Sequence, residues 1–169
     1  FTVERKDRII YFAALVNNGD ASNFFGPVVS QTPLTQTLTL SKLDATASGD
    51  WPLEVSLQGV TVDARHSVDV RVNGNLAGSV AFTGQDRGSA TLRVPRGWLV
   101  EGPNAIELTA RGGSTDVSLV DSIRLTYPHR YEAESGLLKL VAPAGAEIRL
   151  EGADPATRIL DITDSASGV

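Results

Sequence analysis

The chain has 169 residues, of which 41% are hydrophobic and 21% are charged, and its formal net charge is −5. This composition supplies enough apolar surface for a folded core, so it excludes an intrinsically disordered chain. The basic residues are dispersed along an acidic chain, which argues against a nucleic-acid partner, and no apolar run approaches the ~20 residues that a membrane span needs. With no Cys, disulfides, cysteine-ligated metals and a thiol nucleophile are excluded within this chain.

The first predicted element is a nearly continuous apolar run over residues 9–16. A run of this length is typical of a strand that is buried on both faces or covered by a neighbouring layer. A turn is expected at residues 17–20, followed by a loop at residues 23–27 that carries two adjacent aromatic side chains, Phe24 and Phe25.

From about residue 36 onward, apolar and polar residues alternate with a period of two, which predicts half-buried β-strands. Strands are expected at residues 37–40, 53–57, 68–72, 80–82, 92–94, 106–111 and 117–127. Asn73-Gly74 supplies the positive-φ pair of a tight hairpin turn, and Pro95 ends a strand because it lacks an N–H. Residues 98–101 are expected to form one helical turn closed by Gly102. Short strands at this spacing predict an all-β fold, a β-sandwich or a small barrel.

Pro128 marks an expected domain boundary. Three further short strands are predicted after it, around residues 138–140, 148–150 and 160–162, which are too few for an independent core. Residues 129–169 are therefore expected to be the start of a second, truncated β domain of Ig-like type, or strands docked on the first domain. The chain begins without Met and stops in a polar tail, so we expect both ends to be cut from a longer protein.

The sequence offers no assembled catalytic set. Its histidines, His66 and His129, have no nucleophile motif near them, and neither a paired-His metal spacing nor a phosphate-binding glycine loop is present. We expect His66 to be solvated at a strand start and His129 to lie in a linker. Many pairs of acidic residues exist, but nothing selects the pair that a glycosidase needs. The chain is therefore expected not to be an enzyme.

Asp121 is the most informative acidic residue. Over residues 117–127 the alternating inward positions carry apolar side chains except at Asp121. A carboxylate in that phase must be hydrogen-bonded, paired or metal-bound, unless a β-bulge shifts it outward. We expect it to accept backbone N–H groups near a sheet end; a structural Ca²⁺ shared with an acid such as Glu4 stays open as the alternative.

Four aromatic residues are candidates for a platform on which sugar rings stack: Phe24, Phe25, Trp51 and Trp98. Trp51 precedes a proline at an expected strand start, and Trp98 lies in the turn after Pro95. Core packing or loop anchoring is the more frequent role of such residues. Together with Asp121 they form the set of candidate binding residues.

A hairpin, a connection and a Gly-x-Asn step into a buried strand follow one another in segments 68–74, 78–84, 92–95, 102–108 and 120–125. This succession resembles the galactose-binding-like jelly rolls, β-sandwich modules that are appended to many secreted hydrolases. The resemblance implies that residues 1–128 form a jelly-roll β-sandwich, followed by a short partial second β domain.

Segments 3–27, 121–131 and 158–164 are similar to the region that precedes the catalytic domain in bacterial gingipain-type cysteine peptidases. In that family such segments lie upstream of a His/Cys catalytic dyad. This chain has no Cys, so no catalytic residue can be carried over to it. The resemblance implies a non-catalytic piece of a secreted or surface-attached bacterial peptidase.

Two functional hypotheses follow from these observations. The first is an architectural or protein-docking domain whose partners are neighbouring domains of the same polypeptide. The alternative is a carbohydrate-binding module of a secreted hydrolase, with a glycan as its ligand. No cofactor is expected for the first hypothesis, whereas the carbohydrate-binding module predicts exposed Trp or Phe at the loop ends and a bound Ca²⁺ near Asp121; both leave the domain without catalytic residues of its own.

Overall fold

The computed structural model describes residues 1–15, 22–132, 136–138, 145, 147–148, 154 and 156–160. The chain divides into two compact units, Phe1–His129 and Arg130–Val169. The strands of the first unit are β1 (Thr2–Arg5), β2 (Ile10–Tyr11), β3 (Phe24–Phe25), β4 (Val28–Val29), β5 (Leu34–Leu40), β6 (Asp50–Gly59), β7 (Arg65–Val72), β8 (Asn75–Thr83), β9 (Arg87–Pro95), β10 (Gly102–Ala110) and β11 (Ser118–Thr126), and its short 3₁₀ helices are η1 (Ala13–Leu15) and η2 (Arg96–Trp98).

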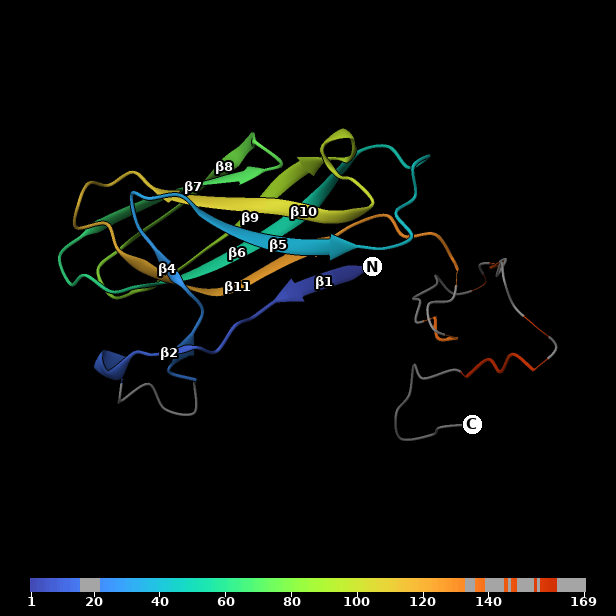
Figure 1. Ribbon diagram of the computed structural model, residues 1–169, viewed down its shortest axis with the longest axis horizontal. Coiled ribbons are helices and arrows are strands. Elements are labelled where there is room, and N and C mark those ends of the chain that lie inside the picture. The colour runs from blue at the N-terminus through green and yellow to red at the C-terminus, as the bar shows by residue number, and fades with distance from the viewer. Residues whose placement is uncertain are drawn as a thin grey trace. The chain divides into compact units, whose positions relative to one another are not determined.

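Two antiparallel sheets form the first unit (Figure 1). One sheet has the order β1-β11-β6-β9 with β4 added beside β11, and the other has the order β5-β10-β7-β8. The chain crosses between the two sheets at every step from β4 to β11 except that from β7 to β8, which is the winding of a jelly roll. The predicted all-β jelly-roll β-sandwich is therefore confirmed. No helix among the described residues is long and apolar enough to cross a membrane.

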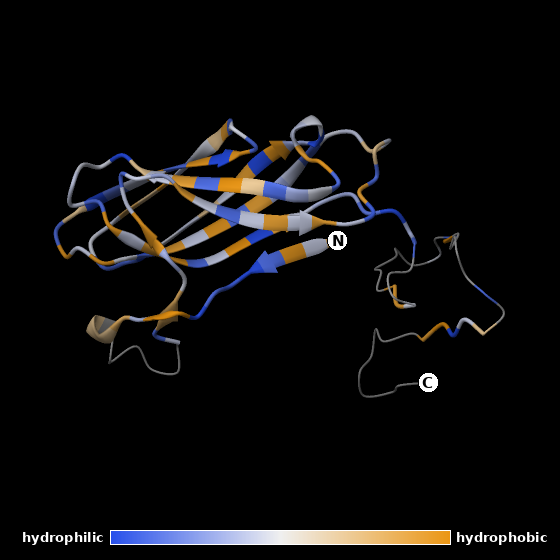
Figure 2. Ribbon diagram, viewed as in Figure 1, coloured by the Kyte–Doolittle hydropathy of each residue, from blue (hydrophilic) through white to orange (hydrophobic). Residues whose placement is uncertain are grey.

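The core lies between the two sheets and follows from the alternation of the strands. Leu53, Val55 and Leu57 of β6, and Val68 and Val70 of β7, are all fully buried, and the hydropathy colouring shows apolar and polar residues alternating along the strands (Figure 2). Each sheet covers the apolar face of the other, so the outer faces are left to polar side chains. Polar side chains that could bind a ligand therefore lie on the outer faces and in the loops.

The turns are largely those that the sequence predicts. Asn73 and Gly74 have φ values of 47° and 85° and join β7 to β8 as a two-residue hairpin turn. Pro95 is the last residue of β9. The helical turn, however, lies at Arg96–Trp98 and not at 98–101, because the Leu99 amide donates to the Arg96 carbonyl at 3.0 Å and Leu99 itself is extended and buried.

A β-bulge in β11 changes the phase of the strand at Asp121. Val120 pairs with Leu57 and Ser122 pairs with Ser56, so Asp121 is the extra residue between them. The odd-numbered residues from Ile123 onward therefore face the core, but before the bulge it is Val120 that belongs to the core cluster. The prediction that the inward positions run unbroken along this strand is wrong, and the bulge that was considered for Asp121 is present.

The described part of the predicted apolar run, residues 9–15, does not form a buried strand. Only Ile10–Tyr11 is extended, pairing with β3 in a separate two-stranded sheet. Ile9 is 69% exposed and Tyr11 is 54% exposed. The run is left outside because the two large sheets already cover each other's apolar faces. Residues 16–21, where the turn was expected, lie outside the described residues.

The second unit begins at Arg130. Leu140, Leu150 and Ile162 of its expected strands lie outside the described residues. A second β domain starting near residue 129 therefore stays a prediction. The isolated bridge between Leu43 and His129 belongs to the end of the first unit, where His129 also stacks on Phe1 at 4.6 Å between ring centroids.

Candidate functional site

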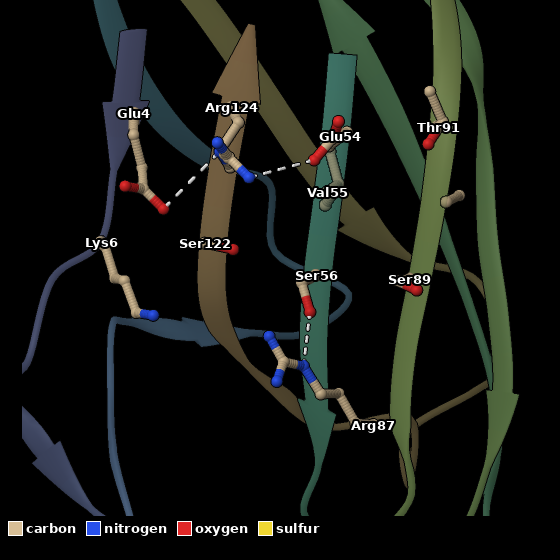
Figure 3. Close-up of a pocket in the computed structure, with 11 residues that line it drawn as sticks. Glu4, Lys6, Glu54, Val55, Ser56, Arg87, Ser89, Thr91, Ser122 and Arg124 are labelled. Atoms are coloured by element: carbon tan, nitrogen blue, oxygen red, sulfur yellow. Dashed lines mark hydrogen bonds and ion pairs between the residues drawn. The ribbon is translucent and has the colours of Figure 1, made fainter. Parts of the chain in front are cut away.

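A polar groove of about 400 Å³ crosses the outer face of the five-stranded sheet (Figure 3). Its lining comes from β1, β11, β6 and β9 and from the residues that adjoin them: Glu4, Lys6, Glu54, Val55, Ser56, Arg87, Ser89, Ala90, Thr91, Ser122 and Arg124. Hydroxyl and charged side chains predominate in this set. The groove is thus suited to a polar ligand.

Strand register explains the floor of the groove. Ser122 of β11 pairs with Ser56 of β6, and Ser56 pairs with Ser89 of β9, so three serines stand in one row across neighbouring strands. We call this set the serine row. Ser56 and Ser122 retain only 8% exposure each, as expected for short side chains lying between longer ones. Strands in a sheet are spaced about 4.8 Å apart, so the row presents hydroxyl groups at regular intervals.

Charged side chains form the next row of the same face. Glu4 pairs with Arg124 across β1 and β11, and Arg124 pairs with Glu54 across β11 and β6. The Arg124 guanidinium lies 3.9 Å from the Glu4 carboxylate and 3.6 Å from the Glu54 carboxylate (Figure 3). Both contacts are solvent-exposed and loose, so each contributes little to stability. The positive charge of Arg124, at this end of the groove, is therefore balanced by two nearby carboxylates.

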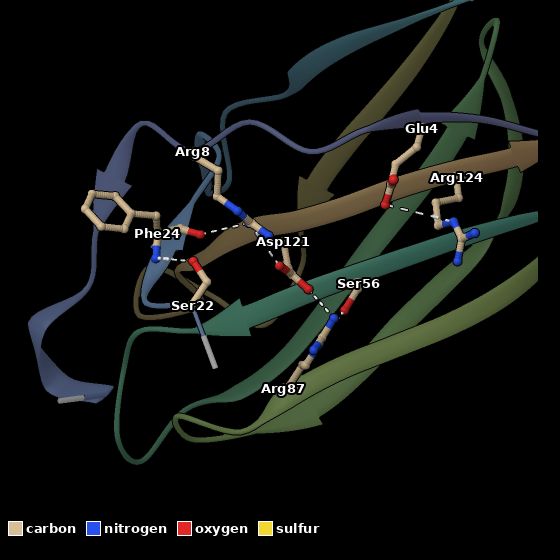
Figure 4. A network of polar contacts seen from close by, with 8 residues as sticks. All are labelled: Glu4, Arg8, Ser22, Phe24, Ser56, Arg87, Asp121 and Arg124. Carbon is tan, nitrogen blue, oxygen red and sulfur yellow. Dashed lines mark hydrogen bonds and ion pairs between the residues drawn. The ribbon is translucent and has the colours of Figure 1, made fainter. Parts of the chain in front are cut away.

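Asp121 lies next to the groove and binds two arginines (Figure 4). Arg8 donates to Oδ1 at 3.2 Å, and Arg87 donates to Oδ2. Arg8 also donates to the Phe24 carbonyl at 2.8 Å, and Arg87 Nε donates to the Ser56 hydroxyl at 2.9 Å. The carboxylate therefore ties the segment after β1 and the start of β9 to β11. The expectation that Asp121 accepts mainly backbone N–H groups is replaced by this pairing with side-chain cations.

The residues around Asp121 do not fit a calcium ion. Calcium takes about six to eight oxygen ligands, whereas both Asp121 oxygens face guanidinium groups, which a cation repels. Glu4, the acid that was expected to share the ion, contacts Arg124 instead. In the described residues no group of three or more His, Asp or Glu side chains could hold a metal.

The four aromatic candidates do not form one platform. Phe25 is 4% exposed and Phe24 is 47% exposed. Trp51 lies in β6 opposite Val94 and, like Trp98 of η2, is a partly buried side chain packed against the core. None of the four lines the groove. Of the four, Phe24 is the exposed one, and it is tied to Asp121 through Arg8, which donates to the Phe24 carbonyl and to the Asp121 carboxylate.

An apolar edge formed by Ile9, Tyr11 and Phe24 is the second exposed feature of note. Tyr11 and Phe24 pair across β2 and β3, and their rings are 5.2 Å apart between centroids. All three side chains are more than 40% exposed. This edge lies on the two-stranded sheet outside the sandwich (Figure 1).

His66 is buried, which contradicts the expectation that it is solvated. Its Nδ1 lies 2.8 Å from Asp116 Oδ1 and its Nε2 lies 2.9 Å from the Gly84 carbonyl. Asp116 also accepts the Ser67 and Gly112 amides at 3.1 and 2.8 Å, and the His66 ring stacks on Phe82. The two ring nitrogens lie beside the Asp116 carboxylate and the Gly84 carbonyl. The His66–Asp116 pair is enclosed, with both side chains 0% exposed, and it joins β7 to the loop before β11.

Comparison with known proteins adds a likeness of fold. No protein-family model and no curated protein matches the chain. Among solved structures, the carbohydrate-binding module CBM36 in complex with calcium and xylotriose is 18% identical, with a TM-score of 0.48, covering 75% of this chain and 99% of that chain. The CBM36-1 domain of a multidomain xylanase from the hindgut metagenome of Trinervitermes trinervoides is 16% identical, with a TM-score of 0.44 over 59% of this chain and 75% of that one.

A further match is the dimeric latent PorU from Porphyromonas gingivalis, which is 13% identical with a TM-score of 0.50. It covers 66% of this chain and 11% of the PorU chain. At such low identities the likeness is one of fold. The likeness to PorU is therefore one of fold alone.

Proposed function

We propose that this chain is a non-catalytic accessory module that binds carbohydrate in the groove on its five-stranded sheet. The observation that carries the proposal is the serine row, in which Ser122, Ser56 and Ser89 align across three strands on the groove floor. Serine hydroxyls both donate and accept hydrogen bonds, as sugar hydroxyls do. Regularly spaced groups running across the strands suit a linear polymer that repeats polar groups along its length.

The charged side chains of the groove are suited to binding rather than to catalysis. Its two carboxylates, Glu4 and Glu54, are 44% and 52% exposed at their side chains and contact the same guanidinium. A glycosidase requires one carboxyl group that is kept protonated beside a second that is ionised, and no environment here distinguishes the two. His66, the buried histidine, is enclosed by Asp116 and Gly84 instead of opening into the groove.

Filling the groove floor is expected to weaken binding. Ser122→Leu removes one hydroxyl and adds bulk at the β11 end of the serine row, so affinity for an oligosaccharide such as xylotetraose should fall by about tenfold or more, the equivalent of one lost hydrogen bond plus a steric clash. Isothermal titration calorimetry of the 169-residue chain measures this change. Ser79→Leu is the matched control, because Ser79 is exposed on β8 of the other sheet.

An unchanged affinity in Ser122→Leu, with folding intact, would place the sugar site elsewhere. Equal losses in Ser122→Leu and Ser79→Leu would show that the effect is not specific to the groove. Absence of binding by any oligosaccharide, in a chain whose circular dichroism shows an intact sandwich, would contradict the proposal itself.

We further propose that the module belongs to the non-catalytic region of a secreted or surface-attached gingipain-like cysteine peptidase. The resemblance of segments 3–27, 121–131 and 158–164 to that family supports this context, and so does the fold shared with PorU. Residues 130–169 would then begin a second β domain that continues in the longer polypeptide. The absence of Cys in this chain agrees with a catalytic dyad located downstream.

A docking role is the second candidate function, favoured by the exposed apolar edge at Ile9, Tyr11 and Phe24. A neighbouring domain that covers this edge would bury side chains that now face solvent. In the longer polypeptide, hydrogen exchange at residues 9–11 and 24–25 should then be slower than in the 169-residue chain. Identical hydrogen-exchange rates in the two proteins would contradict the docking role.

A further inference from the structure

The charges along the groove are unevenly matched, and from this we infer that the bound saccharide carries an acidic group, a carboxylate or a sulfate, held between Lys6 and Arg87. The inference rests on the proposed carbohydrate-binding function and names the class of ligand for the same groove. The two ends of the groove differ in how their charged side chains are paired.

At one end the positive charge is fully matched. The Arg124 guanidinium lies between the Glu4 and Glu54 carboxylates, at 3.9 and 3.6 Å. These three side chains stand in register on β1, β11 and β6. With two carboxylates around one cation, this end disfavours a second anion.

At the other end the positive charge exceeds the negative. Arg8 and Arg87 share one carboxylate, that of Asp121, and Lys6 pairs with no side chain in the described part of the chain. Of the other acids in these segments, Asp7 pairs with Arg5, and Asp86, which accepts from the neutral Thr83 hydroxyl, does not line the groove. Three cations are therefore set against one carboxylate, which makes this end attractive to an anion.

The geometry places the unmatched charges on the ligand side. Lys6 is exposed and lines the groove, and Figure 3 shows its ammonium group directed across the end of the serine row toward Arg87. Arg87 is 62% exposed at its side chain although it binds Asp121 and Ser56. The Ser122 and Ser56 hydroxyls lie at the same end (Figure 3). An acidic group placed there would receive donors from two cations and from the floor.

The test compares three tetrasaccharides by calorimetry on the 169-residue chain: neutral xylotetraose, tetragalacturonate and a sulfated galactan tetrasaccharide. At least one acidic probe is expected to bind about tenfold tighter than the neutral one at low salt, and this advantage should shrink as salt screens the charges. Preference for tetragalacturonate identifies a carboxylate, and preference for the galactan identifies a sulfate; either supports the inference.

Lys6→Gln should reduce the affinity for the preferred acidic probe about five- to tenfold and so remove most of its advantage over xylotetraose. Arg93→Gln is the matched control, because Arg93 is an exposed cation of β9 that does not line the groove. If neutral and acidic probes bind equally, or if Lys6→Gln leaves the acidic preference intact, the inference is overturned while the proposed function stands. If none of the three probes binds, the proposed function fails, and the inference fails with it.

Discussion

Replacing Asp116 with alanine is expected to lower the free energy of unfolding by about 3–5 kcal/mol, because each buried donor that loses its acceptor costs about 1–3 kcal/mol. Asp116 is 1% exposed and accepts three hydrogen bonds, from His66 Nδ1, the Ser67 amide and the Gly112 amide. The substitution leaves the buried His66 nitrogen and two partly buried amides without this acceptor. It also removes the side-chain link between the loop before β11 and β7.

Urea denaturation followed by Trp fluorescence measures this effect. Asp69→Ala is the matched control: Asp69 is also an aspartate paired with a cation, Arg111, but that cation is 53% exposed at its side chain. The control should cost no more than about 1 kcal/mol, as for exposed ion pairs. If Asp116→Ala lowers the free energy of unfolding no more than the control does, the His66–Asp116 contact does not stabilise the fold.

Asn104→Ala is expected to destabilise the fold by about 3 kcal/mol, because it removes the hydrogen-bond partner of several polar groups at once. Asn104 is fully buried. Its Oδ1 accepts the Val100 amide and Asn73 Nδ2, both at 2.9 Å, and its Nδ2 donates to the Val100 and Gly102 carbonyls at 2.8 and 3.0 Å. Asn73 in turn accepts the Ala105 amide at 2.8 Å and donates to the Trp98 carbonyl at 2.8 Å. The two asparagines thus connect the β7–β8 turn to the entry of β10.

Thermal unfolding of Asn104→Ala beside Asn75→Ala tests this role. Asn75 is an exposed asparagine of the same hairpin whose contacts are long, at 3.3 and 3.4 Å, so its removal should change stability by no more than about 0.5 kcal/mol. Asn104→Asp keeps the acceptor but loses the donors, and it should fall between the two. Equal stability of both alanine variants would rule out the asparagine pair as a tie between the turn and β10.

The sequence is sufficient to predict the sandwich because inward and outward positions alternate along most strands. Leu53, Val55 and Leu57 face the core as the period-two pattern predicts, and Asn73-Gly74 forms the predicted turn. The Gly-x-Asn step at Gly102 and Asn104 is visible in the sequence as well. Its meaning, a buried asparagine that binds a turn far away in the sequence, depends on tertiary contact and becomes visible only in the structure.

Three features depend on packing that the local pattern does not encode. The bulge at Asp121 leaves no mark in the residue pattern of β11, although it shifts by one residue which side chains face the core. His66 is polar, and only the proximity of Asp116, fifty residues further on, makes its burial favourable. The apolar residues Ile9 and Tyr11 look like core residues, but the sandwich is already closed without them.

The groove was beyond sequence analysis for a different reason. Ser56, Ser89 and Ser122 are ordinary outward-facing serines in the sequence. They become neighbours only through the pairing of β11 with β6 and of β6 with β9, which depends on strand order and register. A search for small polar residues at outward positions would have named these serines as candidates without showing that they align. The four aromatic candidates, for which the sequence analysis gave core packing or loop anchoring as the more frequent role, lie outside the groove.

The most direct test of the account is to map an oligosaccharide titration of the 169-residue chain by amide chemical shifts in NMR. The account predicts that the shifts concentrate on Ser122, Ser56 and Ser89 and on Lys6 and Arg87 around them, while the strands of the other sheet stay unchanged. Amide shifts confined to the loops between the sheets, or to Tyr11 and Phe24, would contradict the groove as the binding site.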